Sequence, residues 1–163
     1  MKYIIIVLLL PSLFGCFAKK PEKTGMEGKI LPSFKLLLPD SSTYFNTISI
    51  TTGKPTTMFY FGPHCPYSRT QMEEIIKNMS SLKDMRFLIF TTWPFEEMKG
   101  FYEHYNLKKY PNIITGIDFT NFFQDYFKAP GVPYIAIYGK DNRLRESFIG
   151  NIDGKQIKAI AEN

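Results

Sequence analysis

The sequence contains very little cysteine: only Cys16 and Cys65 occur among its 163 residues. So few cysteines exclude a small scaffold held by several disulfides and a zinc site rich in thiolates. Long apolar runs are also absent, because the unbroken run at residues 4–10 is well below the ~20 residues that a membrane-spanning helix needs. No run of five or six like charges occurs either, which argues against a nucleic-acid-binding tail. No Cys/His pair shows a recognised metal-ligand spacing, so we expect no metal, and we also expect no cofactor and no nucleic-acid partner.

The first fifteen residues have the pattern of a secretory signal peptide. A short positive start, Met1-Lys2-Tyr3, precedes the apolar run, and Leu-Phe-Gly-Cys follows it. The Leu-x-Gly-Cys pattern resembles the bacterial lipobox, in which the signal peptidase cuts before the cysteine and that cysteine carries a lipid. The resemblance implies that Cys16 is a lipidated first residue, anchored to a membrane of the cell envelope and facing the periplasm or the exterior. A cut after Ala18 and an uncleaved anchor are the alternatives.

The rest of the chain is predicted to be one domain behind a tether. Residues 16–28 are polar, basic and interrupted by Pro21, Gly25 and Gly28, as in a flexible linker. Residues 29–163 are enough for a single domain. The net charge of +5 falls to +4 once Lys2 leaves with the signal peptide. Because the lysines are scattered, they indicate a solvated basic surface.

Periodicity predicts a mixed α/β domain. Residues 56–61 and 85–91 have the composition of strands buried on both faces, and the segment between them repeats apolar residues at helical spacing. A strand, a helix and a strand in this order imply a parallel pair. The remaining expected elements are a hairpin at 30–38 and 44–50, a helix at 94–105, a short edge strand at 113–117, a helical piece at 121–127, a hairpin at 134–138 and 144–149, and a helix at 154–161.

Cys65 stands where the strand at 56–61 breaks at Gly62-Pro63 and the next helix begins. Unpaired backbone N–H groups and the positive end of the helix dipole favour the thiolate form of a cysteine at such a position. If Cys16 carries a lipid, Cys65 is the single free thiol of an exported protein. It is then either buried and inert or exposed and reactive.

The order of elements, the segment FGPHCPYS at 61–68 and the Val132-Pro133 pair before a β-run resemble the thioredoxin fold. The entrance hairpin and the lipobox are similar to those of the exported TlpA/redoxin group. The resemblance implies a three-layer sandwich with a mixed central sheet, flanking helices and an N-terminal β-hairpin extension.

The resemblance also implies roles for individual residues. Cys65 matches the attacking cysteine of the family, and Pro66 and Tyr67 match the two intervening positions. Pro133 matches the cis-proline that faces the cysteine, although the sequence alone indicates a turn proline. Val132 matches the residue whose backbone pairs with a bound substrate strand.

The sequence departs from the family at Ser68, where members with two cysteines have the resolving cysteine. A serine cannot release a mixed disulfide, although its hydroxyl can donate a hydrogen bond to the thiolate of Cys65. Phe59 replaces the buried acid that assists the resolving cysteine in thioredoxin itself. His64 is a candidate for influencing the ionisation of Cys65 or for moving a proton, and a merely polar loop residue is the competing interpretation.

These residues predict a lipid-anchored protein in which Cys65 exchanges disulfides by a monothiol, isomerase-like or reductase-like mechanism. Its partners would be exported proteins with cysteines or disulfides, an external thiol or reductase, and the membrane that holds the lipid. A degenerate thioredoxin-fold module that only binds partners is the alternative, so the sequence leaves open whether the protein is an enzyme. A one-cysteine peroxiredoxin is disfavoured because Gly62 stands where a Thr or Ser would hold the peroxide.

Overall fold

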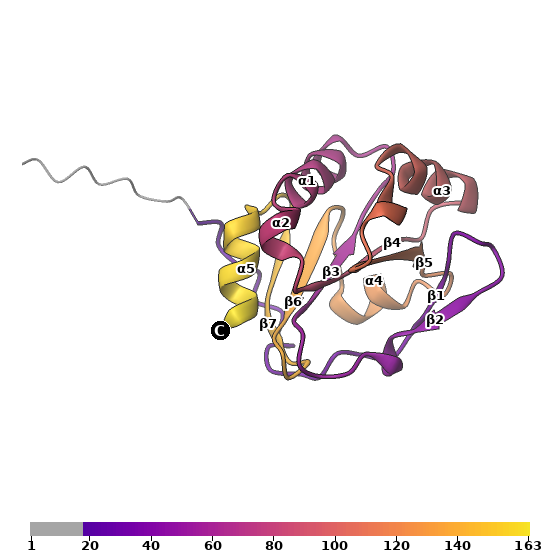
Figure 1. Cartoon of the computed structure of the whole chain (residues 1–163). Helices are drawn as coiled ribbons and strands as arrows, with labels where there is room; N and C mark the ends of the chain where they lie inside the picture. The colour runs from indigo at the N-terminus through magenta and orange to yellow at the C-terminus, as the bar shows by residue number, and fades with distance from the viewer. Residues whose placement is uncertain (1–17) are drawn as a thin grey trace, which may run out of the picture.

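The computed structural model describes residues 18–163, so the predicted signal peptide and Cys16 lie outside the described residues. Its strands and helices follow the order that the sequence predicts, with α2 as an additional short helix after α1 (Figure 1). They are β1 (Lys35–Leu37), β2 (Tyr44–Asn46), β3 (Thr56–Tyr60), α1 (Pro66–Lys77), α2 (Met79–Leu82), β4 (Arg86–Thr91), α3 (Phe95–His104), β5 (Ile113–Ile117), α4 (Phe122–Phe127), β6 (Tyr134–Tyr138), β7 (Leu144–Ile149) and α5 (Gly154–Glu162).

The strands form one mixed sheet in the order β2-β1-β5-β4-β3-β6-β7. β3 lies inside it, parallel to β4 and antiparallel to β6, and all five of its residues are buried. This confirms the prediction of a central strand covered on both faces. It also explains the missing polar alternation in β3, because neither face meets water.

β5 is not the edge strand that its short sequence suggests. It pairs in parallel with β4 on one side and antiparallel with β1 on the other, through Leu37 and Ile117. The approach of β1 depends on Gly116, because a Cβ there would lie only 2.7 Å from the carbonyl oxygen of Leu37. The entrance hairpin β1–β2 therefore extends the sheet beyond β5.

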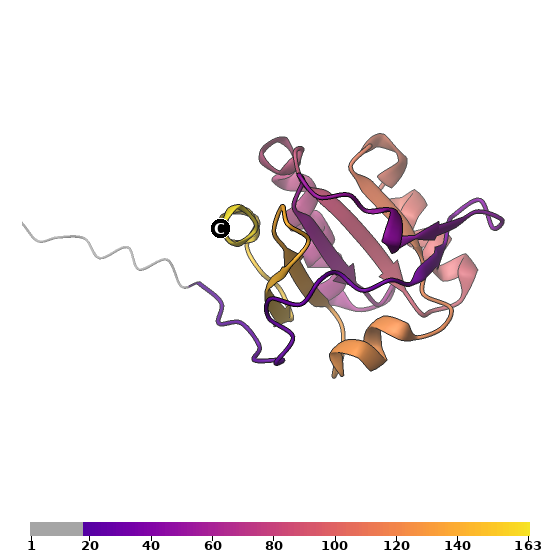
Figure 2. The ribbon, with the colours of Figure 1, turned by 90° about the horizontal axis from the view of Figure 1, so that it is seen from below.

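Helices cover both faces of the sheet unequally (Figures 1 and 2). On one face, α1, α2, α3 and α5 pack over an apolar cluster that includes Phe59, Ile75, Phe101 and Ile157. The other face is covered by α4 and by the chain that leads into β1, around a cluster rich in aromatic rings. The result is the predicted three-layer sandwich, in which α1 and the cysteine at its start are held against β3.

The segment at residues 19–30, most of which has the composition of a flexible tether, is bonded to the domain in the structure. The Glu22 N–H donates to the Ser147 carbonyl at 2.8 Å, and the Gly28 N–H donates to the Leu144 carbonyl at 2.8 Å. The segment therefore lies along the outer side of β7, beside the β6–β7 hairpin (Figure 2). Its prolines and glycines are compatible with this extended path, and the outer side of β7 offers free backbone donors and acceptors.

Candidate functional site

Cys65 is the N-cap residue of α1, with extended backbone angles of φ −74° and ψ 119°. Its carbonyl accepts the first bond of the helix from the Arg69 N–H at 3.1 Å, and its own N–H donates to the Gly62 carbonyl at 3.0 Å. Pro66 occupies the first helical position, where its missing N–H costs nothing. Cys65 is a partly exposed residue and forms no disulfide. The site therefore combines an accessible sulfur with a helix terminus that stabilises negative charge.

The loop before β6 faces this thiol, as the family resemblance implies. The Val132-Pro133 peptide bond is cis. The Cys65 Sγ lies 3.6 Å from the Val132 carbonyl oxygen, within hydrogen-bonding distance for a sulfur donor. Pro133 is buried and Val132 is partly exposed beside it. Two sequence motifs far apart in the chain thus meet at one point of the surface.

Gly62 allows the cysteine loop and the Val132 loop to approach one another. A Cβ at this position would lie 2.9 Å from Cγ2 of Val132, 3.3 Å from the Cβ of Cys65 and 3.4 Å from the indole of Trp93. Sequence reasoning did not identify Trp93 as part of the site. The available signal was its place just after β4, because ligands of open α/β sheets bind beyond the carboxyl ends of the strands.

Ser68 lies in the first turn of α1 and is completely buried. Its hydroxyl oxygen accepts the Gly62 N–H at 3.1 Å. Within residues 18–163, no hydrogen bond joins Ser68 to Cys65, so the expected contact with the thiolate is not formed in this structure. Ser68 instead fixes the glycine that brings the two loops together.

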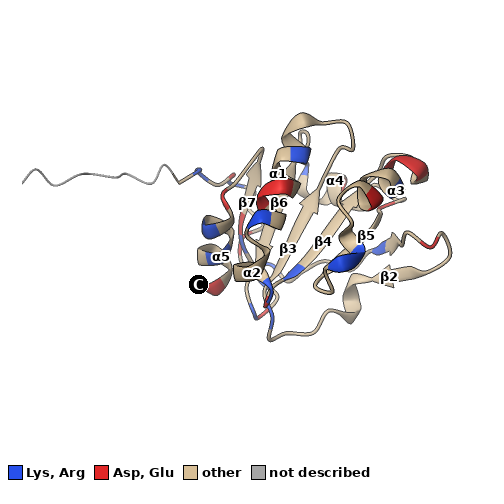
Figure 3. Cartoon of the chain, turned by 45° about the horizontal axis from the view of Figure 1, so that its top comes forward, with Lys and Arg blue, Asp and Glu red and all other residues tan. Residues whose placement is uncertain are grey.

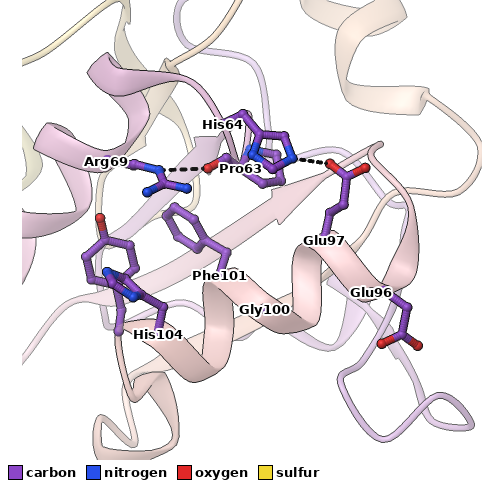
Figure 4. Close-up of a pocket in the computed structure, with 9 residues that line it drawn as sticks. Pro63, His64, Arg69, Glu96, Glu97, Gly100, Phe101 and His104 are labelled. Atoms are coloured by element: carbon purple, nitrogen blue, oxygen red, sulfur yellow. Dashed lines mark hydrogen bonds and ion pairs between the residues drawn. The ribbon is translucent and has the colours of Figure 1, made fainter.

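His64 turns toward α3 (Figure 4). Its Nε2 lies 2.9 Å from Oε2 of Glu97, and the His64 side chain is 72% exposed. Beside this pair is a cavity of about 330 Å³, which Arg69 and Phe101 also line. Arg69 donates from Nε to the Pro63 carbonyl at 3.0 Å. The structure thus gives His64 a carboxylate partner on α3.

Pro66 and Tyr67 are both exposed, as expected of residues that meet a substrate. Tyr67 has 67% of its surface exposed. Its backbone carbonyl accepts a hydrogen bond from Nδ2 of Asn151 at 2.8 Å. Asn151 lies between β7 and α5 and was also not identified from the sequence, because a single amide in a loop carries no pattern.

The surroundings of Phe59 agree with the loss of a buried acid at this position. Its ring is fully buried, 5.9 Å from the ring of Phe61.

In the described part of the chain, no group of three or more His, Cys, Asp or Glu side chains is placed to hold a metal ion. Over the same residues, none of the helices combines the length and the apolarity of a membrane span.

No known protein-family model and no curated protein sequence matches the chain. Solved structures do resemble it. A secreted Mycobacterium tuberculosis disulfide oxidoreductase homologous to E. coli DsbE has 18% identity and a TM-score of 0.64, over 77% of this chain and 95% of that one. StoA from Bacillus subtilis has 11% identity and a TM-score of 0.61, over 80% and 97%.

A third similar structure is the pneumococcal exposed lipoprotein thioredoxin Etrx1 from Streptococcus pneumoniae. It has 14% identity and a TM-score of 0.60, over 81% of this chain and all of that one. The likeness thus extends over most of the described residues and nearly the full length of these proteins. Together with the sheet order, the cysteine at the start of α1 and the loop that faces it, this shows that the chain has the thioredoxin-like fold.

Proposed function

We propose that the protein exchanges thiols and disulfides on exported proteins through Cys65 alone, while a lipid on Cys16 anchors it to the cell envelope. The observation that carries the proposal is the partly exposed Cys65 at a helix N-cap, with its sulfur 3.6 Å from the Val132 carbonyl. The similarity to structures named as a disulfide oxidoreductase and a lipoprotein thioredoxin supports it.

In the first step, the Cys65 thiolate attacks one sulfur of a substrate disulfide. The substrate S–S bond breaks as the mixed disulfide forms, and the second substrate sulfur leaves as a thiolate that takes a proton from water. An extended substrate strand pairing with the backbone of Val132 would bring its sulfur beside Cys65.

Because Ser68 has no thiol, another thiol must resolve the mixed disulfide. If a second substrate cysteine attacks, a new substrate disulfide forms and Cys65 is regenerated, so the net reaction is isomerisation. If external thiols attack, two of them are required, and they leave as one disulfide while the substrate is reduced.

The test is trapping in the native compartment. Cells expressing the unaltered protein or Cys65→Ala are acidified and alkylated, and disulfide-linked partners are separated without reductant. We expect adducts with the unaltered protein and none with Cys65→Ala. Thr70→Ala is the matched control, because Thr70 is exposed, bonds only the Pro66 carbonyl at 3.1 Å and should leave trapping unchanged.

An equal yield of adducts from Cys65→Ala would overturn the exchange mechanism. Slow alkylation of Cys65 in the folded protein, at the rate of a buried thiol, would favour the binding module instead. The anchor has a separate test: the intact mass should include a lipid, and Cys16→Ser should abolish it.

A further inference from the structure

The N-terminal segment is fixed to the domain at its first described residues. The Lys19 N–H donates to Oε1 of Gln156 at 3.0 Å, and Nε2 of Gln156 donates back to the Lys19 carbonyl at 2.7 Å. Further along, Glu22 pairs with Ser147. The side chain of Gln156, in the first turn of α5, therefore holds the chain as it arrives from the direction of Cys16.

This attachment point adjoins the candidate site. Nζ of Lys19 lies 2.7 Å from the position that a Cβ on Gly150 would occupy. The Gly150 N–H donates to the carbonyl of Pro133 at 2.8 Å, and the preceding carbonyl, that of Val132, faces the sulfur of Cys65. The chain thus enters the domain within a few direct contacts of the thiol.

The next residue of the same loop makes a second connection. Asn151 holds the carbonyl of Tyr67 at 2.8 Å, and Tyr67 is the exposed residue two positions after Cys65. The entry point of the chain and the exposed rim of the site therefore lie on the same side of the domain.

The sequence sets a short limit on the distance to the anchor. Cys16 precedes Lys19 by three positions. Three residues span at most about 11 Å even when fully extended. An acyl chain on Cys16 would hold Cys16 at the membrane surface. Lys19 would therefore lie within about 11 Å of that surface.

We propose that the face formed by residues 19–23, the β7–α5 loop and the exposed rim around Tyr67 lies against the bilayer. Cys65 then acts on disulfides held close to the membrane surface, such as those of membrane proteins or of other lipid-anchored chains. This rests on the proposed function, both for the lipid on Cys16 and for exchange at Cys65. Cys65 would then select its substrates by the distance of their disulfides from the bilayer.

Charge favours the same orientation toward anionic headgroups. Residues 18–30 contain four lysines and two glutamates. The lysines of α5 (Figure 3) lie away from this face, because Lys155 lines a hollow with Lys77 and Lys158 lines one with Lys54. Juxtamembrane lysines are attracted to anionic leaflets. The attraction assists the short anchor, which itself sets the orientation.

The first experiment measures the position of Cys65 directly. The full lipidated protein is placed in phosphatidylcholine vesicles, Cys65 is labelled with a small fluorophore, and lipids with a quencher on the headgroup are added. We expect quenching at least threefold stronger than in a variant with 20 Gly/Ser residues inserted between Ala18 and Lys19. Such a linker has a root-mean-square length of roughly 25 Å and releases the domain from the surface.

A label at the opposite edge of the sheet, beside β1 and β2, is the matched control. Ser42, exposed in the β1–β2 turn, carries the fluorophore in a Cys65→Ala, Ser42→Cys variant. Its quenching should be weak with or without the inserted linker. Equal quenching at both positions, or quenching at Cys65 that the insertion does not change, overturns the orientation. A mass without lipid overturns the anchor and the orientation together.

The second experiment measures the consequence for exchange. Disulfide peptides are attached to the vesicles through a short or a long spacer, and a third peptide is left free in solution. The unaltered protein should react at least tenfold faster with the short-spacer peptide, and the inserted linker should remove this preference. No reaction with the free peptide defeats the exchange function itself, whereas a normal reaction with it but no spacer preference defeats only the membrane-proximal substrate.

Discussion

The sulfur of Cys65 and the carbonyl oxygen of Val132 lie 3.6 Å apart, although 67 positions separate the two residues in the chain. The contact combines the start of α1 with the loop before β6. It places the only thiol of residues 18–163 beside a backbone carbonyl at the edge of the site.

Gly62→Ala should destabilise the protein and speed the alkylation of Cys65. The added methyl group would lie 2.9 Å from Cγ2 of Val132 and 3.3 Å from the Cβ of Cys65, so the two loops must separate. Overpacking of this kind costs about 1–3 kcal/mol. Urea unfolding gives the free energy of unfolding, and iodoacetamide kinetics give the accessibility of the thiol.

Gly100→Ala is the control for this substitution. Gly100 lies inside α3, and a Cβ there would meet no atom within 4 Å. Alanine should raise the free energy of unfolding by about 0.5–1 kcal/mol, because it is the better helix former. If both variants changed stability by the same amount in the same direction, close packing at Gly62 would be refuted.

Ser68→Cys should convert the site to one that forms an internal disulfide. Position 68 is buried in the first turn of α1, three residues after the N-cap cysteine. After mild oxidation, we expect both thiols to resist alkylation and the mass to fall by two hydrogen atoms. Trapped partners should decrease, because the new thiol releases the mixed disulfide.

The matched control for this variant is Ser68→Ala, which also loses the hydrogen bond to the Gly62 N–H. The loss should cost about 0.5–1.5 kcal/mol of stability in both variants. Two alkylatable thiols in the oxidised Ser68→Cys protein would contradict the geometry.

His64→Ala should leave the alkylation rate of Cys65 within about threefold, or roughly 0.6 kcal/mol in the barrier. The imidazole has its contact with Glu97 on α3 at 2.9 Å and is otherwise well exposed. Exposed ion pairs contribute only about 0.2–1 kcal/mol, so the free energy of unfolding should change little, as it should in Glu97→Gln. A tenfold drop in the rate for His64→Ala alone would assign His64 a direct effect on the thiol.

Asp40→Asn should weaken the β1–β2 turn at neutral pH more than in acid. The Asp40 carboxylate accepts the hydroxyl of Thr43 and the N–H groups of Ser42 and Thr43, which lowers its pKa to about 2. A depressed folded pKa stabilises the folded state above the unfolded pKa, near 3.9, and the effect is lost as the pH falls toward 2.

The measurement for Asp40 is the urea midpoint at a series of pH values. The urea midpoint of the unaltered protein should be higher than that of Asp40→Asn at pH 7. The difference between the two midpoints should shrink below about pH 4. A difference that stayed constant down to the lowest pH at which both fold would show that the charge is not involved.

The sequence predicted most of the elements, because buried strands and amphipathic helices have clear patterns. The residues of β3 and β4 are nearly all buried because both faces are covered, and the buried Ile157 and Ile160 of α5 lie at helical spacing. The place of β5 was missed, since one long-range pair, Leu37 with Ile117, decides whether it is an edge strand. Such a pair leaves no local signal.

At the site, the family resemblance predicted that Cys65 contacts the Val132 loop. Hydrophobic periodicity alone does not predict this contact. The resemblance did not supply the orientation of single side chains. The Ser68 hydroxyl bonds the Gly62 N–H, and His64 turns to α3, because partners from the folded backbone and from another helix are available there. The bonds that hold residues 22–30 against β7 are mostly between backbone groups, so side-chain composition could not reveal them.

Residues 22–30 also cover the outer edge of β7 and so prevent a second molecule from pairing with that strand. β7 is the last strand of the sheet, and the Leu144 N–H and carbonyl are occupied by the carbonyl of Lys29 and the N–H of Gly28. A chain shortened to begin at Leu31 would leave these groups bare, and bare strand edges recruit strands from neighbouring molecules. Removal of the residues before Leu31 should therefore yield a protein that aggregates.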